Sequence, residues 1–318
     1  MGLEISMNSQ NEIKMAMDPK EWGMLIALSI LWGGAYFSNA VAVQELPTFF
    51  LVALRVAIGA CTLFIVLKLM GLSMPTDRAH WLAFFGMGLL NNAIPFSLIV
   101  WGQSHIASSL ASILNAATPL FTVLVAHFLT HDEKMTFNRV LGIVIGFAGV
   151  AYMIGFDALS TLGDQVWAQL ACIGATISYA FSGVFGRRFK RMGTPPLATA
   201  TGQLTASALI LVPISLFVEQ PWLLDMPSMS AIGAVLFVAI GGTSLAYLLF
   251  FRILSAAGAT NIMLVTLLVP ISAILLGTAF LGEVLEAKHV IGMLFIALGL
   301  AAIDGRPWSI ISRRWKAA

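Results

Sequence analysis

Residues 107–133 read ASSLASILNAATPLFTVLVAHFLTHDE and form one long, largely apolar stretch. It can cross a bilayer as a helix, which takes about 20 predominantly apolar residues. Pro119 lies near its middle, and a mid-helix proline cannot donate a backbone hydrogen bond to the carbonyl four residues earlier, here that of Asn115. Unsatisfied polar groups are costly in lipid, so we expect Asn115 to face protein or a water-filled cavity.

Residues 258–283, GATNIMLVTLLVPISAILLGTAFLGE, repeat this arrangement in the second half of the chain. Pro270 lies mid-span and the residue four positions earlier is again polar, Thr266. Three residues recur at a spacing of 150: Glu133, Gly142 and Gly149 match Glu283, Gly292 and Gly299. A repeat of half the chain length is typical of transporters with two related halves and a site between them.

The composition predicts an integral membrane protein. Hydrophobic residues make up 59% of the 318 residues, charged residues 10%, and the mean hydropathy is +0.92. A soluble domain has about 25% charged residues. The expected partners are the lipid bilayer and a small-molecule substrate; no nucleic acid, metal or cofactor is expected. Cys61 and Cys172 fall in apolar spans and are expected to be buried thiols rather than a disulfide.

Ten membrane spans are expected, in two repeats of five. They lie at residues 22–43, 47–71, 80–103, 107–130, 137–155, 167–187, 195–218, 229–253, 258–281 and 287–304. The expected organisation is a cytoplasmic tail (1–21), a first repeat (22–155), a connecting loop (156–166), a second repeat (167–305) and a cytoplasmic tail (306–318). With both termini in the cytoplasm, 15 of the 17 Lys and Arg residues lie on the inner side, as the positive-inside rule requires.

An odd number of spans per repeat makes the two repeats inverted relative to each other. The first spans match in carrying Trp32 and Tyr179 at the same level. Pro47 opens the second span and Arg55 follows eight residues later, whereas Pro195 opens the seventh span and Gln203 follows at the same interval. The sequence therefore predicts an all-α membrane protein with ten transmembrane helices in two inverted five-helix repeats.

These features together resemble the drug/metabolite transporter superfamily. The residues that carry the resemblance are Trp32-Gly33 in the first span, Pro119 and Pro270 mid-span, and the doubled Glu–Gly–Gly pattern. The chain resembles the EamA-type exporters over essentially its whole length, and within them the bacterial exporters of aromatic amino acids. The resemblance implies a central cavity lined by the first, third and fourth helices of each half.

The candidate substrate-binding residues are polar or aromatic side chains within spans. They are Trp32, Tyr36, Asn91, Asn115, Tyr179, Ser182, Tyr247 and Thr266, and the candidate kink or gating residues are Pro95, Pro119 and Pro270. Each polar side chain could instead bind a neighbouring helix, and Trp32 and Tyr179 could serve packing alone.

Arg55 is the basic residue that the expected spans place inside the membrane. It lies about 12 Å into its helix from Pro47 at 1.5 Å per residue. Such a residue either serves function, here as a partner for a substrate carboxylate, or extends its charge toward the interface. The glycines near the ends of the fifth and tenth spans favour close helix packing, within one protomer or in a homodimer.

The absence of acidic residues mid-span narrows the function. All 15 Asp and Glu residues fall in tails, loops or span ends, so the sequence lacks the buried carboxylate of a cation–proton antiporter. It also lacks the several buried cations of a sugar-phosphate exchanger and the His-Glu-x-x-His helix of an intramembrane protease. We expect an inner-membrane exporter of small neutral metabolites, amino acids in particular, rather than an enzyme. A broad-specificity drug/metabolite exporter and a non-transporting membrane enzyme or processing factor stay open as alternatives.

Overall fold

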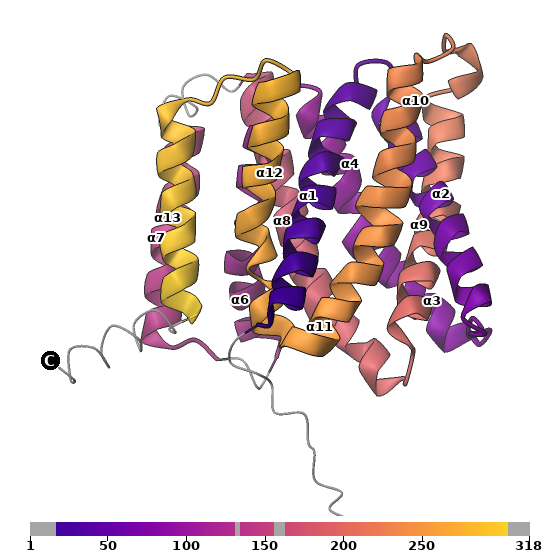
Figure 1. Cartoon of the computed structure of the whole chain (residues 1–318), viewed down its shortest axis with the longest axis horizontal. Helices are drawn as coiled ribbons and strands as arrows, with labels where there is room; N and C mark the ends of the chain where they lie inside the picture. The colour runs from indigo at the N-terminus through magenta and orange to yellow at the C-terminus, as the bar shows by residue number, and fades with distance from the viewer. Residues whose placement is uncertain (1–16, 131–133, 156–162, 305–318) are drawn as a thin grey trace, which may run out of the picture.

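The computed structural model describes residues 17–130, 134–155 and 163–304 and forms a bundle of roughly parallel and antiparallel helices (Figure 1). Among these residues, nine helices are long and apolar enough to cross a membrane, and Val265–Phe280 is a shorter tenth. In these described ranges the fold is all-helical, and the nine long helices with the shorter tenth give the ten spans that the sequence predicts. Glu133, most of loop 156–166, most of the tail 1–21 and all of the tail 306–318 lie outside the described residues.

The first half contains five spans, two of them interrupted. They are α1 (Pro19–Ala42), α2 (Thr48–Leu69), the third span α3–η1–α4 (Arg78–Gly88, Leu89–Ala93, Ile94–Gln103), the fourth span α5–α6 (Ser108–Asn115, Thr118–Leu129) and α7 (Phe137–Ile154). Prolines mark several starts, since Pro19 opens α1 and Pro47 precedes α2. Proline suits a helix start because the missing N–H has no intrahelical acceptor there.

The second half repeats this order. It consists of α8 (Asp164–Arg191), α9 (Pro196–Val218), the short η3 (Pro221–Leu223), the eighth span α10–η4–α11 (Met229–Leu236, Phe237–Leu245, Ala246–Ile262), α12 (Val265–Phe280) and α13 (Ala287–Asp304). Non-helical torsion angles at Gly258 (φ 80°, ψ 170°) end the eighth span within α11. With five spans in each half, the halves have opposite directions across the membrane.

The third spans of both halves contain a π-helical segment at mid-height. In the first half it is η1, which precedes Pro95; in the second it is η4, which contains Gly241-Gly242. The hydroxyls of Thr243 and Ser244 donate to the carbonyls five residues earlier, at 2.8 and 3.1 Å. π-Helical turns inside α-helices often occur at functional sites, and here they mark equivalent positions in the two repeats.

The two halves interlock rather than lie side by side. The second helices α2 and α9 pack against each other, α1 packs on α12, and α4 and α6 pack on α8. The fifth helices α7 and α13 form a pair at one edge of the bundle (Figure 1). A Cβ at Gly299 would lie 2.5 Å from the Gly142 carbonyl oxygen, and one at Gly149 would lie 2.7 Å from the Gly292 carbonyl oxygen. The glycine pattern therefore serves contact within one protomer.

Both described ends of the chain lie at the same end of the bundle (Figure 1). The opposite end holds residues 43–47, 104–107, 219–228 and 281–286. We call this opposite end the predicted outer end, because the distribution of Lys and Arg predicts that it faces away from the cytoplasm.

Candidate functional site

A network of polar side chains joins the two halves at mid-height. Asn91 Nδ2 donates to the Tyr247 hydroxyl at 2.9 Å, and that hydroxyl donates to Asn92 Oδ1 at 2.9 Å. Ser182 Oγ donates to Asn91 Oδ1 at 2.9 Å. Asn91 and Asn92 come from η1, whereas Ser182 and Tyr247 come from α8 and α11. We call these four residues, with Gln203 and Ser207, the central polar cluster.

Helix α9 closes the cluster on a second side. Gln203 Oε1 lies 3.4 Å from Asn91 Nδ2, and Ser207 Oγ accepts from Asn92 Nδ2 at 3.2 Å. The Ser207 hydroxyl donates in turn to the Gly88 carbonyl at 3.0 Å. The π-helical segment at η1 exposes backbone and amide groups at this level, and α9 supplies their partners.

Arg55 lies in the same central region from the side of α2 and is 7% exposed. Its Nε donates to the Thr243 hydroxyl at 2.9 Å, and its guanidinium carbon lies 3.6 Å from the centre of the Phe96 ring. Stacking on an aromatic face is a favourable cation–π geometry. Among the described residues, no carboxylate forms a salt bridge with Arg55.

Three tyrosines lie close enough to the Arg55 guanidinium to interact with its charge: Tyr36, Tyr179 and Tyr247. Tyr36 is buried at 7% exposure, whereas Tyr179 and Tyr247 are half-buried. Tyr179 packs against both large hydrophobic clusters of the bundle, so it lies at the junction of the two. Trp32 of α1 packs against one of these clusters, with its ring centre 5.9 Å from that of Phe250.

The structure brings together three of the predicted residues, because Asn91, Ser182 and Tyr247 share hydrogen bonds. Tyr179 lies one turn before Ser182 on α8, where its carbonyl is an alternative acceptor for the Ser182 hydroxyl at 2.8 Å. Pro95 lies at the start of α4, directly after the π-helical segment. These residues come from three different spans, and sequence reasoning grouped them only by residue type.

Asn115 and Thr266 lie apart from this hydrogen-bonded network. The fourth span breaks between Asn115 and Thr118, and the Thr118 hydroxyl donates to the Asn115 carbonyl at 2.7 Å. In the ninth span the break precedes α12, and the Thr266 hydroxyl donates to the Met263 carbonyl at 2.7 Å. Pro119 lies in the first turn of α6, whereas Pro270 lies inside α12. At each break a threonine hydroxyl therefore donates to a backbone carbonyl of the preceding turn.

The prediction did not include Gln203, Asn92, Ser207 and Thr243 among the site residues. A signal for Gln203 exists in the sequence, because it follows Pro195 at the interval at which Arg55 follows Pro47. Thr243 and Ser207 are small hydroxyl residues in apolar helices and give no comparable signal, since such residues usually bond to their own helix.

Three carboxylates link the halves at the predicted outer end. Glu219 accepts from the backbone N–H groups of Phe49 and Phe50 at 2.8 and 2.5 Å. Glu283 accepts from those of Ser108 and Ser109 at 2.7 and 3.0 Å. These N–H groups belong to the first turns of α2 and α5, where helix dipoles favour negative charge.

The third carboxylate, Glu45, accepts from the backbone N–H of Ser228 at 2.6 Å and from its hydroxyl at 2.5 Å. Ser228 is the N-cap of α10. These hydrogen bonds lower the pKa of Glu45 below its ordinary value of 4.5. All three links join a residue of one half to a helix start in the other half.

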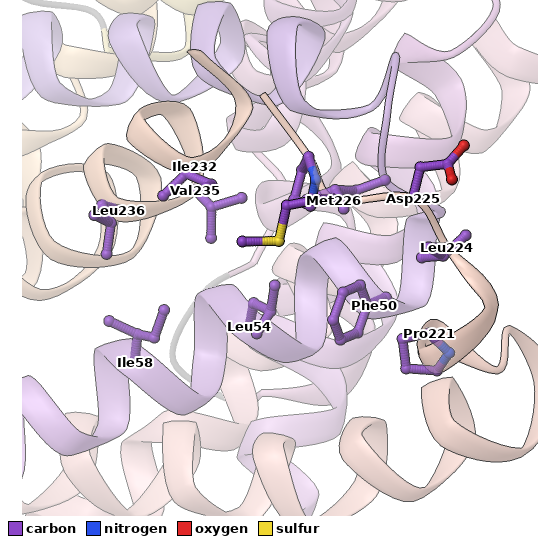
Figure 2. A pocket seen from close by; sticks show the side chains of 12 residues that line it. Phe50, Leu54, Ile58, Pro221, Leu224, Asp225, Met226, Ile232, Val235 and Leu236 are labelled. Carbon is purple, nitrogen blue, oxygen red and sulfur yellow. The ribbon is translucent and has the colours of Figure 1, made fainter. Parts of the chain in front are cut away.

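Two grooves lie on the sides of the bundle, away from the polar cluster. One, of about 490 Å³, lies between α2 and α10 at the predicted outer end (Figure 2). Figure 2 shows Phe50, Leu54 and Ile58 of α2 opposite Ile232, Val235 and Leu236 of α10. The other, of about 470 Å³, lies between α2 and α9. Their walls are almost wholly apolar, so they lack the polar groups that orient a small polar ligand.

Comparison with known protein families finds the EamA-like transporter family twice in this chain, over residues 21–155 and again over residues 166–303. The chain belongs to the EamA-like transporter family. Members of this family are transporters rather than enzymes, and the two matched ranges coincide with the two halves of the bundle.

Relatives of this EamA transporter have similar length. The "Uncharacterized inner membrane transporter YedA" of Escherichia coli (strain K12) is 28% identical over 291 residues, covering 89% of this chain and 90% of the relative. "Protein PecM" of Dickeya dadantii (strain 3937) is 27% identical, covering 90% and 92%. The "Uncharacterized transporter YoaV" of Bacillus subtilis (strain 168) is 23% identical, covering 87% and 94%.

A solved crystal structure has the same fold, with a TM-score of 0.64, 20% sequence identity and coverage of 89% of this chain and 97% of that chain. In this EamA transporter the second helices α2 and α9 supply Arg55, Gln203 and Ser207 to the central region.

Proposed function

We propose that this EamA transporter exports amino acids, the larger and aromatic neutral ones first, across the inner membrane by alternating access. The observation that carries the proposal is the central polar cluster, in which Asn91, Ser182 and Tyr247 join both halves at mid-height. Transporters of two inverted halves bind substrate where the halves meet.

The chemistry of the cluster suits a small zwitterion with an apolar or flat side chain. Amide and hydroxyl groups of Asn91, Ser182 and Tyr247 can bind an ammonium or a carboxylate, and Arg55 can bind a carboxylate. Aromatic faces from Trp32 and Tyr179 suit flat side chains. A multiply charged ligand would lose hydration that these groups do not replace.

Alternating access needs two closed ends that open in turn. The links from Glu45, Glu219 and Glu283 join the halves at the predicted outer end and would hold that end closed. Opening toward the outside would then break these links, while the breaks after Asn115 and before Val265 let the fourth and ninth spans repack.

The proposal includes cytoplasmic termini. In a variant whose native cysteines are replaced by serine, a cysteine at Gln44 should react with a membrane-impermeant reagent applied to intact cells, and one at Met192 should not. Labelling of the Met192 position from outside would reverse the orientation.

The experiment for the substrate is uptake of labelled phenylalanine into liposomes that contain the purified protein. We expect saturable uptake that unlabelled neutral amino acids compete for, with aromatic ones strongest, and weak competition by sugar phosphates or dicationic drugs. Competition by sugar phosphates without competition by neutral amino acids would contradict the proposal. Competition by many unrelated drugs would instead favour a broad-specificity drug/metabolite exporter.

A further inference from the structure

The central region contains one buried cation whose charge nothing in the described protein neutralises. Arg55 is 7% exposed and forms no salt bridge with a carboxylate of the described residues. Isolated charges are costly in a low-dielectric interior and are normally paired. A buried, unpaired guanidinium is therefore a position where a ligand of opposite charge gains most from binding.

The guanidinium is held in place but keeps most of its donors free. An arginine side chain has five N–H donors. Only the Nε–H is bound, by the Thr243 hydroxyl at 2.9 Å, and the Phe96 ring covers one face at 3.6 Å. The edge formed by Nη1 and Nη2 has no acceptor among the described residues.

The atoms of that edge keep some contact with solvent. Six side-chain atoms of the described residues are sealed from solvent without a partner, and the Arg55 nitrogens are not among them. The half-buried Tyr179 and Tyr247 lie within electrostatic range of the guanidinium. The site therefore combines a free two-pronged donor edge with aromatic walls.

The equivalent position in the other half shows that the charge is not required by the fold. Arg55 and Gln203 lie eight residues after Pro47 and Pro195, and each bonds to the third span of the opposite half. At the position of Gln203, a neutral amide is therefore enough for helix packing and for a hydrogen bond to the opposite half. The charge at Arg55 is an asymmetry between two halves that are otherwise similar here.

We infer that Arg55 is the specificity-determining residue that binds the substrate's carboxylate end-on through Nη1 and Nη2, and that the site recognises aromatic monocarboxylates whether or not they carry an ammonium group. The paired N–H donors of a guanidinium match a carboxylate in geometry and charge. No Asp or Glu of the described residues hydrogen-bonds to the central polar cluster, so an ammonium would find only amides, hydroxyls and ring faces. This inference rests on the proposed function and defines its substrate class by the carboxylate and the aromatic group, with the ammonium not required.

The test is equilibrium binding to the purified full-length protein with three related compounds. Phenylalanine has both charged groups, 3-phenylpropionate lacks the ammonium, and phenethylamine lacks the carboxylate. We expect 3-phenylpropionate to compete for labelled phenylalanine about as well as phenylalanine itself. Phenethylamine should be weaker by about tenfold to a hundredfold, the range for a charged hydrogen-bonding pair.

Arg55→Gln should remove this preference for the carboxylate and weaken binding of 3-phenylpropionate by a similar factor. Glutamine is the residue at the equivalent position, so the variant is expected to fold. Arg55→Lys keeps the charge but loses the paired donors, and should recover only part of the affinity. The matched control is Lys68→Gln, which removes a cation from the same helix where Lys68 lies 5.4 Å from the Phe64 ring centre, outside the cluster.

The outcomes separate the inference from the proposed function. If phenylalanine binds, phenethylamine competes equally and 3-phenylpropionate does not compete, the inference is wrong while amino-acid transport stands. If labelled 3-phenylpropionate binds with loss in Arg55→Gln but phenylalanine does not bind, the contact between Arg55 and a carboxylate stands, whereas the tolerance of an ammonium group and the amino-acid proposal both fail. If neither phenylalanine nor 3-phenylpropionate binds to wild-type protein, the inference and the proposed function are both contradicted. If Arg55→Gln does not fold, the comparison of the three compounds on wild-type protein still tests the inference.

Discussion

The Nε atom of Arg55 lies 2.9 Å from the Thr243 hydroxyl and joins the second helix of one half to the third span of the other. The inverted counterpart is the pair of Gln203 and Asn91, whose side chains lie 3.4 Å apart. One turn further along α2 and α9, Ser244 Oγ lies 3.1 Å from the Gly59 carbonyl oxygen and Ser207 Oγ lies 3.0 Å from that of Gly88. The two halves therefore meet through repeated contacts, and the main chemical difference between them is the guanidinium.

Tyr247→Phe should impair transport without unfolding the protein. The hydroxyl accepts from Asn91 and donates to Asn92, so its removal leaves both amides short of a partner and loosens the cluster. A lost buried hydrogen bond costs about 1–3 kcal/mol, which corresponds to at least a severalfold fall in substrate affinity if the cluster binds substrate. The measurement is the concentration of phenylalanine that half-saturates uptake.

The control for this substitution is Tyr152→Phe. Tyr152 lies on α7 with 44% of its surface exposed, away from the cluster. Equal uptake by the two variants would show that the Tyr247 hydroxyl serves packing only.

Pro119→Ala and Pro270→Ala should each slow transport severalfold while leaving folded protein. Alanine supplies the N–H that proline lacks, so each substitution favours a straighter span and resists repacking between the two closed states. The measurement is the maximal rate of uptake. Pro213→Ala is the matched control, because Pro213 lies inside α9 and lines the apolar groove rather than a broken span. Unchanged rates in both test variants would mean that these prolines are only architectural.

Glu283→Gln should loosen the predicted outer end. The two carboxylate oxygens of Glu283 accept from the N–H groups of Ser108 and Ser109, whereas a neutral amide has a single acceptor oxygen. Hydrogen bonds to charged groups contribute about 1.5–3 kcal/mol to stability. The distribution of distances between spin labels at Ser104 and Val284 should therefore contain a larger long-distance population in Glu283→Gln than in the protein with Glu283. Glu286→Gln is the control, since Glu286 pairs with Lys288 of the same segment at 2.9 Å. Identical distance distributions for Glu283→Gln and wild-type protein would rule out a closing role for this link.

The link from Glu45 to Ser228 should depend on pH in one direction. The pKa of Glu45 is lowered from 4.5 by the hydrogen bonds from Ser228, so the carboxylate is favoured in the folded state. Its contribution to stability should be complete above pH 4.5 and lost as the pH falls through the lowered pKa. The measurement is the difference in Tm between wild-type protein and Glu45→Gln. A difference that stays constant on acidification would contradict this assignment.

The sequence predicted the architecture because membrane spans and their repetition are visible in one dimension. Hydrophobic length located all ten spans, and the recurrence of Pro119 as Pro270 indicated two halves. The site was predicted only in part. Ser207 and Thr243 bond across the interface between halves, and the rotation of an almost uniformly apolar helix cannot be read from residue order.

The breaks in the fourth and ninth spans illustrate the same limit. A proline indicates that a backbone carbonyl loses its partner, but not which group replaces the missing donor. Here the Thr118 and Thr266 hydroxyls bond to backbone at the breaks, and the polar side chains that join the halves come from other spans. The expectation for Asn115 and Thr266 as substrate ligands therefore stays a prediction that uptake by their alanine variants can check.

Counterflow tests the central claim, a carrier for amino acids with alternating access, most directly. Liposomes containing the wild-type protein are loaded with unlabelled phenylalanine, and a trace of labelled phenylalanine is added outside. We predict that the label accumulates transiently above its equilibrium level, because each outward movement of unlabelled substrate returns the site to the other side. Label that never exceeds equilibrium, or that enters protein-free liposomes equally fast, would contradict the account.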